Sequence, residues 1–497
     1  MGIFLKQSFW TSIIIYLGVL LGFLNSLILF PKFLETEQIG LLRQIISAAS
    51  LLLPLSAFGI SATAIKFYPL YKHKFESKNE FFSIQFILSS IGFILTCLLI
   101  WIFYDQVSGV FSKNSKLLID YFDIVLIILL ILTISSIFEA FLRARMDIIL
   151  SNFINGVLNR FLIGICVIFL SLSIINFNEL VYLQIPIYSL GVIILIFYSY
   201  FKDPFKIKFR FIKIKKDIKK ILDFSIYSII SGFGNIIILN VDILMVSALL
   251  GLSDTGVYTT AFYIGIIIEM PRRAISQISI PIISNFFKNK DLKTLDYYYK
   301  MVSINQLIIG GLIYLLVLIN LENIYNLIPN KENFINGIGV VSIIGIAKLI
   351  NMASSFGSEI IIMSKYYRFN VITIIILATI TISSNFILIP KFGILGAAYA
   401  ALFSTIIFNL IKIIFINYRL KLNPFTINTL ITIFIFIVVQ FISGYLPKID
   451  NIIIDIIYKS TFITLIFIMP IYFLKISKEL NNLISKYLKK LNLIKNL

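Results

Sequence analysis

Basic side chains inside long apolar segments are the residues of this chain best suited to binding chemistry: Arg43, Arg160, Arg272, Arg273 and Lys348. A charge at the middle of a bilayer costs at least about 2.5–3.5 kcal/mol, so such residues are expected to face a bundle interior or a water-filled cavity. Guanidinium groups match phosphate oxygens with paired hydrogen bonds. The five cations therefore predict a hydrated interior that binds an anionic, phosphate-bearing ligand.

Three acidic residues accompany these cations and are candidates for ion coupling or structural pairing: Asp242, Glu269 and Glu359. Glu269 stands three and four residues before Arg272 and Arg273, so one arginine can be neutralised within its own helix. Adjacent residues diverge by about 100° around a helix, and the other arginine is therefore expected to meet the cavity. Asp242 is equally suited to be a structural partner for Arg43.

Several charged residues have an alternative outside the cavity. Arg160 lies about two turns inside its segment, so its side chain could instead extend to the headgroup layer. Lys412, Asp455 and Lys459 lie near helix ends or in the last two segments. These three are expected to contact the lipid interface or to serve packing.

Two prolines mark expected bends. Pro54 shares a helical face with Arg43, eleven residues earlier, and Pro271 directly precedes Arg272. Because proline removes a backbone hydrogen bond, both helices are predicted to kink or hinge beside the basic residues.

Residues for nucleophilic or metal chemistry are scarce. The chain has one histidine, His73, in a lysine-rich loop, and two cysteines, Cys97 and Cys166, inside apolar segments. This inventory argues against a Cys/His metal site, a disulfide framework and a Ser-His-acid triad. The sequence therefore predicts no catalytic residue, no metal, no cofactor and a protein that is not an enzyme.

The composition indicates which elements must carry these side chains. Hydrophobic residues make up 59% of the chain and charged residues 13%, against about 45–50% and 25% in soluble domains. The apolar runs are long enough for membrane-spanning helices and do not alternate as barrel strands do. The prediction is an all-α polytopic membrane protein with about 14 transmembrane helices. The expected spans are 8–30, 39–65, 82–104, 122–142, 152–173, 179–201, 221–250, 256–283, 300–320, 337–363, 369–389, 393–417, 425–446 and 452–474.

Lysine and arginine distinguish the two alternating sets of loops. The set that includes both termini contains 30 of these residues, and the other set contains six. Because cytoplasmic loops carry the basic excess, both termini are predicted to be cytoplasmic. The net charge of +19 is then explained by topology and by attraction to anionic lipid, and nucleic-acid binding is not expected.

The loops also indicate the domain organisation. All the loops of the less basic set are short, which argues against a membrane glycosyltransferase with its catalytic residues in a large outer loop. A basic connector separates six expected spans from eight. The prediction is an N-terminal six-helix bundle, a cytoplasmic connector, a second six-helix bundle and a C-terminal helix pair with a basic tail: 1–201, 202–220, 221–417 and 418–497.

A sequence repeat relates the two bundles. Gly40 closely follows an acidic residue near the start of the second span, and Gly256 does so at the start of the eighth, 216 residues later. A proline follows each glycine by 14 or 15 residues. Parallel repeats of this kind are typical of transporters, whose substrate sites lie near the midplane between the halves.

Short motifs at these turns carry a family resemblance. The segments are Asn240–Met245 with Gly251–Ala261, Pro390–Ala398, and the Gly-Leu-Leu-Arg turn at 40–43. They resemble the polysaccharide-exporter family, the oligosaccharide or O-antigen flippases of the multidrug/oligosaccharidyl-lipid/polysaccharide superfamily. The resemblance extends over essentially the whole chain. It implies two pseudo-symmetric six-helix bundles plus two C-terminal helices, as in the multidrug and toxin extruders (MATE), with spans one, two, seven and eight lining the cavity.

The resemblance also implies a function. The expected activity is to move an undecaprenyl-diphosphate-linked oligosaccharide from the inner to the outer leaflet of the bacterial cytoplasmic membrane by alternating access. The cargo would be a repeat unit of O-antigen for lipopolysaccharide, of capsule or of exopolysaccharide. The expected partners are this lipid-linked substrate, the bilayer, a polysaccharide polymerase and glycosyltransferases; the oligomeric state is left open.

Two alternatives come from the same superfamily. One is a lipid II flippase, and the other is a multidrug or cation antiporter. Antiporters of the superfamily commonly use an acidic residue in the N-terminal bundle, whereas the first span has Tyr16, Asn25 and Ser26 but no acid. That difference, with the basic interior, favours the oligosaccharide flippase.

Overall fold

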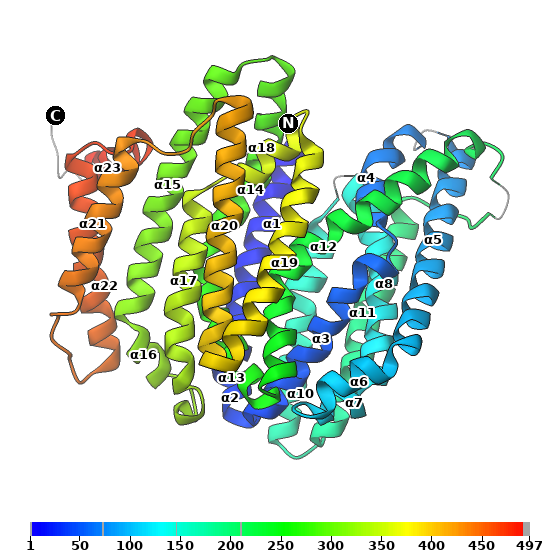
Figure 1. The fold of residues 1–497 in the computed structure, drawn as a ribbon, viewed down its shortest axis with the longest axis horizontal. Coiled ribbons are helices and arrows are strands. Elements are labelled where there is room, and N and C mark those ends of the chain that lie inside the picture. Colours follow the sequence, from blue (N-terminus) through cyan, green and yellow to red (C-terminus); the bar gives the residue numbers. More distant parts are fainter. Residues whose placement is uncertain (1, 72–73, 146, 209–210, 491–497) are drawn as a thin grey trace. The chain divides into compact units, whose positions relative to one another are not determined.

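The computed structural model describes residues 2–71, 74–145, 147–208 and 211–490, so His73 lies outside it. Within these ranges only the backbone is described for a few stretches: 2–12, 230–231, 234–235, 237–239, 273–274, 277–278, 281 and 487–490. The part of the chain described is all-helical and contains no strand (Figure 1). This confirms the predicted fold class.

Packing divides the chain into two compact units. Unit 1 comprises Met1–Thr260 and Thr381–Ala397, and unit 2 comprises Ala261–Ile380 and Ala398–Leu497. Three helices continue from one unit into the other: α13 (Leu252–Ile266), α19 (Tyr367–Phe392) and α20 (Ile394–Leu420). The proposed division at residues 202–220 into two bundles stays a prediction.

Unit 1 contains the helices of the first half of the chain. They are α1 (Gly2–Phe23), the π-helical turn η1 (Leu24–Leu29), α2 (Phe30–Phe33), α3 (Thr36–Ser56), α4 (Ile60–Tyr71), α5 (Phe75–Ile102), α6 (Tyr104–Ser112), α7 (Lys116–Asp120), α8 (Phe122–Ala144), α9 (Ile149–Phe153), the π-helical turn η2 (Ile154–Leu158), α10 (Asn159–Ser171), α11 (Phe177–Lys202), η3 (Lys215–Asp217) and α12 (Ile218–Leu249).

Unit 2 contains the remaining helices. They are η4 (Ile267–Glu269), α14 (Met270–Lys288), α15 (Leu292–Ile319), α16 (Leu321–Asn326), η5 (Lys331–Asn333), η6 (Ile335–Gly337), α17 (Ile338–Ala353), α18 (Gly357–Met363), α21 (Ile427–Ser443), α22 (Ile452–Phe473) and α23 (Lys478–Lys490).

Helices occupy all fourteen of the expected membrane segments. Eleven spans in the described residues are long and apolar enough to cross a bilayer. The other three expected segments correspond to α12, to α13 with α14, and to α21, which are interrupted, shorter or only partly described. The chain is therefore a multi-pass membrane protein, and the count of fourteen crossings stays a prediction.

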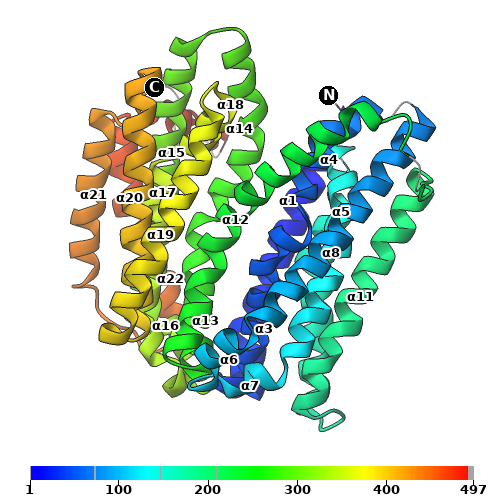
Figure 2. The same cartoon turned by 45° about the vertical axis from the view of Figure 1, so that its right-hand side comes forward.

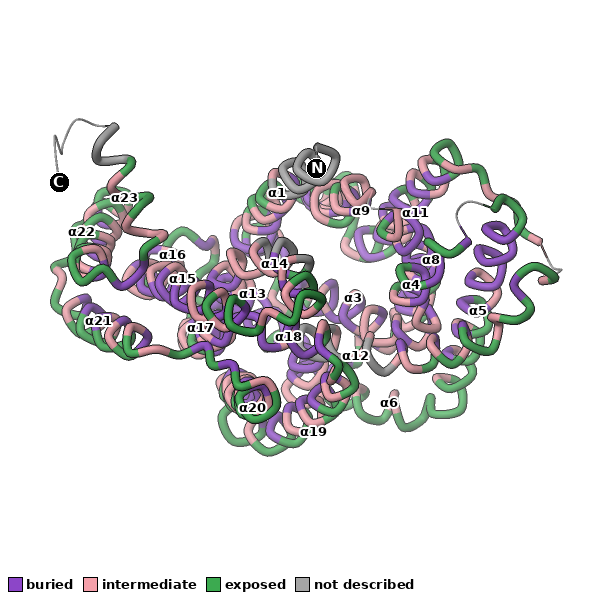
Figure 3. Tube along the Cα trace, turned by 90° about the horizontal axis from the view of Figure 1, so that it is seen from above, coloured by how far each residue is buried: buried purple, intermediate pink, exposed green. Residues whose placement is uncertain are grey.

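Each unit is organised around a central helix. In unit 1, α8 has 67% of its apolar window buried and packs against α3, α4, α5 and α11 (Figures 1 and 2). In unit 2, α15 packs against α14, α17, α21 and α22, and its buried residues stand out in Figure 3. Outer surfaces such as α6 are exposed. Because bundle interiors exclude lipid, polar side chains on the central faces need protein partners.

Candidate functional site

Glu269 is the centre of a buried ionic cluster in unit 2. Its Oε1 accepts a hydrogen bond from Arg272 Nη1 at 3.2 Å and another from Asn351 Nδ2. Its Oε2 lies 3.3 Å from Lys348 Nζ. Glu269 is 6% exposed and Lys348 is 8% exposed. One carboxylate thus partly compensates the charges of two buried cations, Arg272 and Lys348, which would be costly to bury without an acidic partner.

A helix interruption places Glu269 and Arg272 together. The eighth expected span is α13, the short 3₁₀ turn η4 ending at Glu269, and then α14. Pro271 stands in the first turn of α14, where its missing N–H costs no intrahelical hydrogen bond. The acid therefore lies just before the new helix and Arg272 in its first turn.

A second interruption lies opposite, between α17 and α18. Ser355 adopts φ of 51°, and the last carbonyls of α17 are left without helical partners. Arg272 Nη2 donates to the carbonyl of Ser355 at 3.3 Å, and the Tyr299 hydroxyl donates to that of Ser354 at 3.2 Å. Ser303 Oγ donates to the carbonyl of Ala353. Arg272 therefore also stabilises the break.

Glu359, on α18, completes the acidic part of the cluster. Its Oε1 lies 3.7 Å from Arg272 Nη2 and accepts a hydrogen bond from Ser276 Oγ. Its Oε2 is buried and accepts no hydrogen bond in the described structure. Lys412, on α20, is 2% exposed and donates to Ser358 Oγ at 3.1 Å. Lys412 thus belongs to the unit 2 interior rather than to the lipid interface.

The unit 2 cluster has an excess of formal positive charge. Arg272, Lys348 and Lys412 face two carboxylates, those of Glu269 and Glu359. The formal charge of these five side chains is therefore +1. Removing either carboxylate would leave buried cations uncompensated, a loss worth about 3–5 kcal/mol.

Unit 1 carries the other predicted cations, in contact with the first span. Arg43 Nη2 donates to Ser26 Oγ at 2.6 Å, and its guanidinium lies 5.3 Å from the centre of the Phe30 ring. Arg160 Nη1 donates to the carbonyl of Gly18. Both arginines thus contact the first span: Arg160 before the π-helical turn η1, and Arg43 within it at Ser26 and directly after it at Phe30.

The position of the Arg160 side chain explains why a glycine, Gly22, faces it on α1. Gly22 leaves space that the guanidinium occupies, because a Cβ there would collide with Arg160 Nη1. Asn25 Nδ2 in turn donates to the Arg160 carbonyl at 2.7 Å. Arg160 therefore points into the α1–α10 contact within unit 1, and the two π-helical turns, η1 and η2, adjoin it.

Asp242, on α12, lies within a polar contact of unit 1. Its Oδ1 accepts a 2.6 Å hydrogen bond from Asn385 Nδ2, and its Oδ2 lies 3.4 Å from the Tyr258 hydroxyl. Pro54 lies inside α3, which ends two residues later, and the chain resumes as α4 after a turn containing Phe58 with φ of 50°.

The structure therefore gathers some of the predicted residues and separates others. Arg272, Lys348, Glu269 and Glu359 form one cluster in unit 2, whereas Arg43, Arg160 and Asp242 belong to unit 1. The Arg273 side chain lies outside the described residues.

Two members of this cluster, Asn351 and Lys412, are not among the binding residues that the sequence predicted. Asn351 carried a signal, since it follows Lys348 by three residues on one helical face. Lys412 stands eight residues inside the end of α20, and its distance from that end was the available signal.

The described residues contain no metal-type cluster. No group of three or more His, Cys, Asp or Glu side chains in them could hold a metal ion, and Cys97 and Cys166 are free thiols. The expectation of no metal and no catalytic residue stays a prediction.

Comparisons with known proteins show which membrane proteins this chain resembles. A full-length relative is an uncharacterized membrane protein, MJ1068, of Methanocaldococcus jannaschii, 23% identical over 98% of both chains. The fold matches lipid II flippase MurJ in an inward closed conformation, with a TM-score of 0.72, 17% identity, and coverage of 93% of this chain and 98% of that one. It also matches an inward-facing MATE family multidrug resistance transporter of the MOP superfamily, with a TM-score of 0.67, 13% identity, and coverage of 83% and 98%.

The fold is therefore that of the MOP-superfamily transporters. Residues 4–287, more than half of the chain, match the family described as polysaccharide biosynthesis protein, and the chain belongs to that family. This confirms the family to which the sequence motifs pointed; of these motifs, those at 40–43 and 240–261 lie within the matched residues.

Proposed function

We propose that this protein is a flippase that moves an undecaprenyl-diphosphate-linked oligosaccharide from the inner to the outer leaflet of the cytoplasmic membrane. The proposal rests chiefly on the unit 2 cluster, in which Arg272, Lys348 and Lys412 outnumber two acids. Membership of the polysaccharide biosynthesis family supports a glycan cargo. A diphosphate is the group of such a cargo that arginine recognises best.

Arg272 is the residue expected to bind the diphosphate in unit 2. Its guanidinium already contacts Glu269 and Glu359, so phosphate oxygens would replace carboxylate oxygens of the same geometry. Such an exchange gives Arg272 an anionic partner in both states, and competition from the two carboxylates favours moderate affinity and release. The oligosaccharide would remain hydrated, and the prenyl chain would remain in lipid. Transport then needs no bond to be made or broken.

Export of a lipid-linked glycan tests this proposal. A host lacking its own flippase would express the chain, and surface glycan would be measured at equal membrane levels of each variant. Arg272→Ala is expected to abolish export and Arg272→Lys to retain part of it, because lysine keeps the charge without the paired geometry. Arg43→Ala, Arg273→Ala and Lys348→Ala are expected to reduce export.

A control separates binding from folding. Arg368→Ala removes an exposed arginine and should leave export unchanged. Because Arg272 also holds the carbonyl of Ser355, thermal unfolding in detergent must accompany each export measurement. Normal export with all four residues replaced by Ala, at normal expression, would show that the cationic residues do not bind the cargo.

The second candidate function is a lipid II flippase. The likeness to lipid II flippase MurJ covers nearly all of both chains and favours it. Both cargoes share the lipid diphosphate and differ in the sugars. Reconstituted protein offered either lipid II or a lipid-linked oligosaccharide would distinguish them, and transport of lipid II alone would favour this second function.

A further inference from the structure

Polar side chains at the start of α5 hold the connector 202–220 against unit 1. Asn79 Oδ1 accepts the backbone N–H of Lys206 at 3.1 Å, and Ser83 Oγ accepts that of Lys208 at 2.7 Å. Asn79 and Ser83 are fully buried. The connector passes the Phe75 end of α5 in Figure 1. Because its backbone donors are satisfied by α5, this irregular segment has a defined outer surface.

The later part of the connector is held in the same way. Glu80 Oε2 accepts the backbone N–H of Lys213 at 2.8 Å and that of Ile214 at 3.2 Å. The Ile214 side chain is fully buried in the apolar core of unit 1. The side chains on either side of Ile214 are exposed. The connector therefore turns its lysines outward along most of its length.

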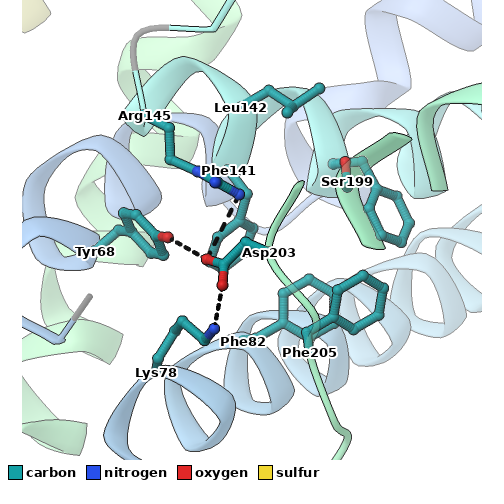
Figure 4. A pocket seen from close by; sticks show the side chains of 10 residues that line it. Tyr68, Lys78, Phe82, Phe141, Leu142, Arg145, Ser199, Asp203 and Phe205 are labelled. Atoms are coloured by element: carbon teal, nitrogen blue, oxygen red, sulfur yellow. Dashed lines mark hydrogen bonds and ion pairs between the residues drawn. The ribbon is translucent and has the colours of Figure 1, made fainter. Parts of the chain in front are cut away.

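Asp203 fixes the beginning of the connector. Lys78 Nζ and the Tyr68 hydroxyl both donate to its carboxylate, the latter at 2.9 Å (Figure 4). Arg145 Nη1 lies 3.5 Å from the same group. Three elements, α4, α5 and the end of α8, thus converge on one acid.

The connector is strongly basic in sequence. It holds nine Lys and Arg residues against two acids. Both acids already have partners, since Asp217 accepts a hydrogen bond from Tyr71 at 2.8 Å and Asp203 is bound as described above. Lys208 and Lys213 share the exposed Glu76 at 3.6 and 3.8 Å, and such surface pairs contribute little. The positive charge is therefore available to a ligand.

Apolar surface adjoins this charge. Ile207 and Ile212 on the connector are 46% and 72% exposed. Below the connector, the α5 face that carries Ser83 continues through Ile91 and Ile94, which are 44% and 56% exposed. At 1.5 Å per residue, Ile91 and Ile94 lie about 12–17 Å along the helix from Ser83. That distance is roughly the depth of one leaflet of hydrocarbon.

We propose that the connector and α5 together bind an anionic phospholipid, with its phosphate against Lys206, Lys208 and Lys213 and an acyl chain along Ile91 and Ile94. A soluble acidic partner would meet the lysines but would have no use for the apolar stripe below them. A phospholipid uses both surfaces. The site is separate from the ionic cluster of unit 2, and its occupation does not require transport.

Brominated lipids test this site in the full-length protein. Trp10→Phe and Trp101→Phe remove the two native tryptophans, and Ile94→Trp places a reporter on the exposed stripe. The protein would be reconstituted in phosphatidylcholine vesicles containing brominated phosphatidylglycerol or brominated phosphatidylcholine. Quenching of the reporter tryptophan should show a relative affinity for phosphatidylglycerol roughly five- to tenfold higher than for phosphatidylcholine, because several lysines attract the anionic headgroup.

Matched lysine variants identify the source of the preference. Lys206→Gln, Lys208→Gln and Lys213→Gln together should bring the preference close to one. The same change at Lys288, Lys290 and Lys293, three exposed lysines around the turn between α14 and α15 of unit 2, should leave it intact. Equal quenching by both lipids in the unaltered connector, or a preference that survives the first triple change, would show the proposal to be wrong.

Discussion

The buried carboxylate of Glu269 is the residue on which the unit 2 cluster depends. It is shared by Arg272 and Lys348, and Asn351 supplies a further hydrogen bond. A shared acid of this kind compensates two cations that would otherwise be buried in a medium of low dielectric. Its replacement should therefore affect folding as well as transport.

We expect Glu269→Gln to destabilise the protein by about 3–5 kcal/mol, because two buried cations lose their counter-charge. The measurement is thermal or denaturant unfolding in detergent. Adding Lys348→Met should recover part of the loss, since one of the two cations is then removed. Glu322→Gln is the control, because it breaks the exposed pair with Lys448 and should change stability by less than about 1 kcal/mol. Equal effects at the two sites would contradict this account.

Asp203 offers a prediction of pH dependence at the connector. Burial raises the pKa of this carboxyl, but hydrogen bonds from Lys78 and Tyr68 and the charges of Lys78 and Arg145 outweigh it and hold the pKa below its ordinary value. A depressed folded-state pKa means that the stabilisation is present above the unfolded pKa, near 3.9, and is lost as pH falls through the lower folded value.

Asp203→Asn should therefore lower stability by a nearly constant amount from pH 8 to pH 5, about 1–3 kcal/mol for hydrogen bonds to a charged group. The difference from the unaltered protein should shrink below about pH 4. Unfolding midpoints across this range are the measurement, and Asp450→Asn, an exposed acid, is the control. A difference that grew on acidification would mean that the sign of the pKa shift is wrong.

At the scale of elements, the two repeat glycines meet. A Cβ on Gly40 of α3 would collide with the carbonyl of Leu252, and a Cβ on Gly256 of α13 would collide with that of Thr36. Each glycine thus packs on the carbonyl four residues before the other. The Thr36 and Ser253 hydroxyls lie 2.7 Å apart at this crossing. The reciprocity is what a parallel repeat requires of two equivalent helix starts.

Gly40→Ala or Gly256→Ala should push this crossing apart and destabilise the protein by about 1–3 kcal/mol. Gly109→Ala is the control, since no atom lies within 4 Å of the added Cβ. Unfolding of the three variants in detergent measures the difference. A neutral Gly40→Ala would mean that the helices do not approach as closely as described.

The same crossing can be tested by a crosslink. With Cys97 and Cys166 replaced by Ala, Thr36→Cys and Ser253→Cys should form a disulfide on oxidation, detected by peptide mass analysis. Under the proposed flippase function, contacts at the ends of these helices open during alternating access. Export should then stop when the disulfide forms and return on reduction. A crosslink that forms without affecting export would show that the crossing stays closed during transport.

Periodicity and charge predicted the helical segments, and prolines marked two expected bends, at Pro54 and Pro271, but the conformation of each break and the interruption at Ser355 had no local signal. The segments follow from apolar runs, which are local. The breaks at Phe58 and Ser355, both with positive φ, depend on partners far away in sequence, such as Arg272 at the carbonyl of Ser355. The Glu269–Arg272 contact could be predicted because the two residues are only three positions apart in the sequence. The contacts of Lys348 and Lys412 depend instead on which helices pack together.

For the whole molecule, the distribution of basic residues predicts the direction of insertion. The loops on the same side as both termini contain 30 Lys and Arg residues, nine of them in the connector 202–220. The loops on the other side contain only six. An even number of crossings is required if both termini share a side. The interrupted helices matter here, because α3 with α4, α13 with α14, and α17 with α18 must each count as one crossing in the predicted total of fourteen.

Single-cysteine labelling of a chain without Cys97 and Cys166 tests this topology. Cysteine placed at Asp254 or Lys331 should react with a membrane-impermeant maleimide in intact cells, because both lie in the loops with few basic residues. Cysteine at Lys215 or Lys290 should react only after permeabilisation. Each of the four positions lies at a loop or a helix end, so modest perturbation is expected. Labelling of position 215 from outside would reverse the orientation, and it would also place the phospholipid site of the connector in the outer leaflet. Accessible cysteines at both 254 and 290 would instead mean that α13 and α14 do not together cross the membrane, and the count of fourteen would be wrong.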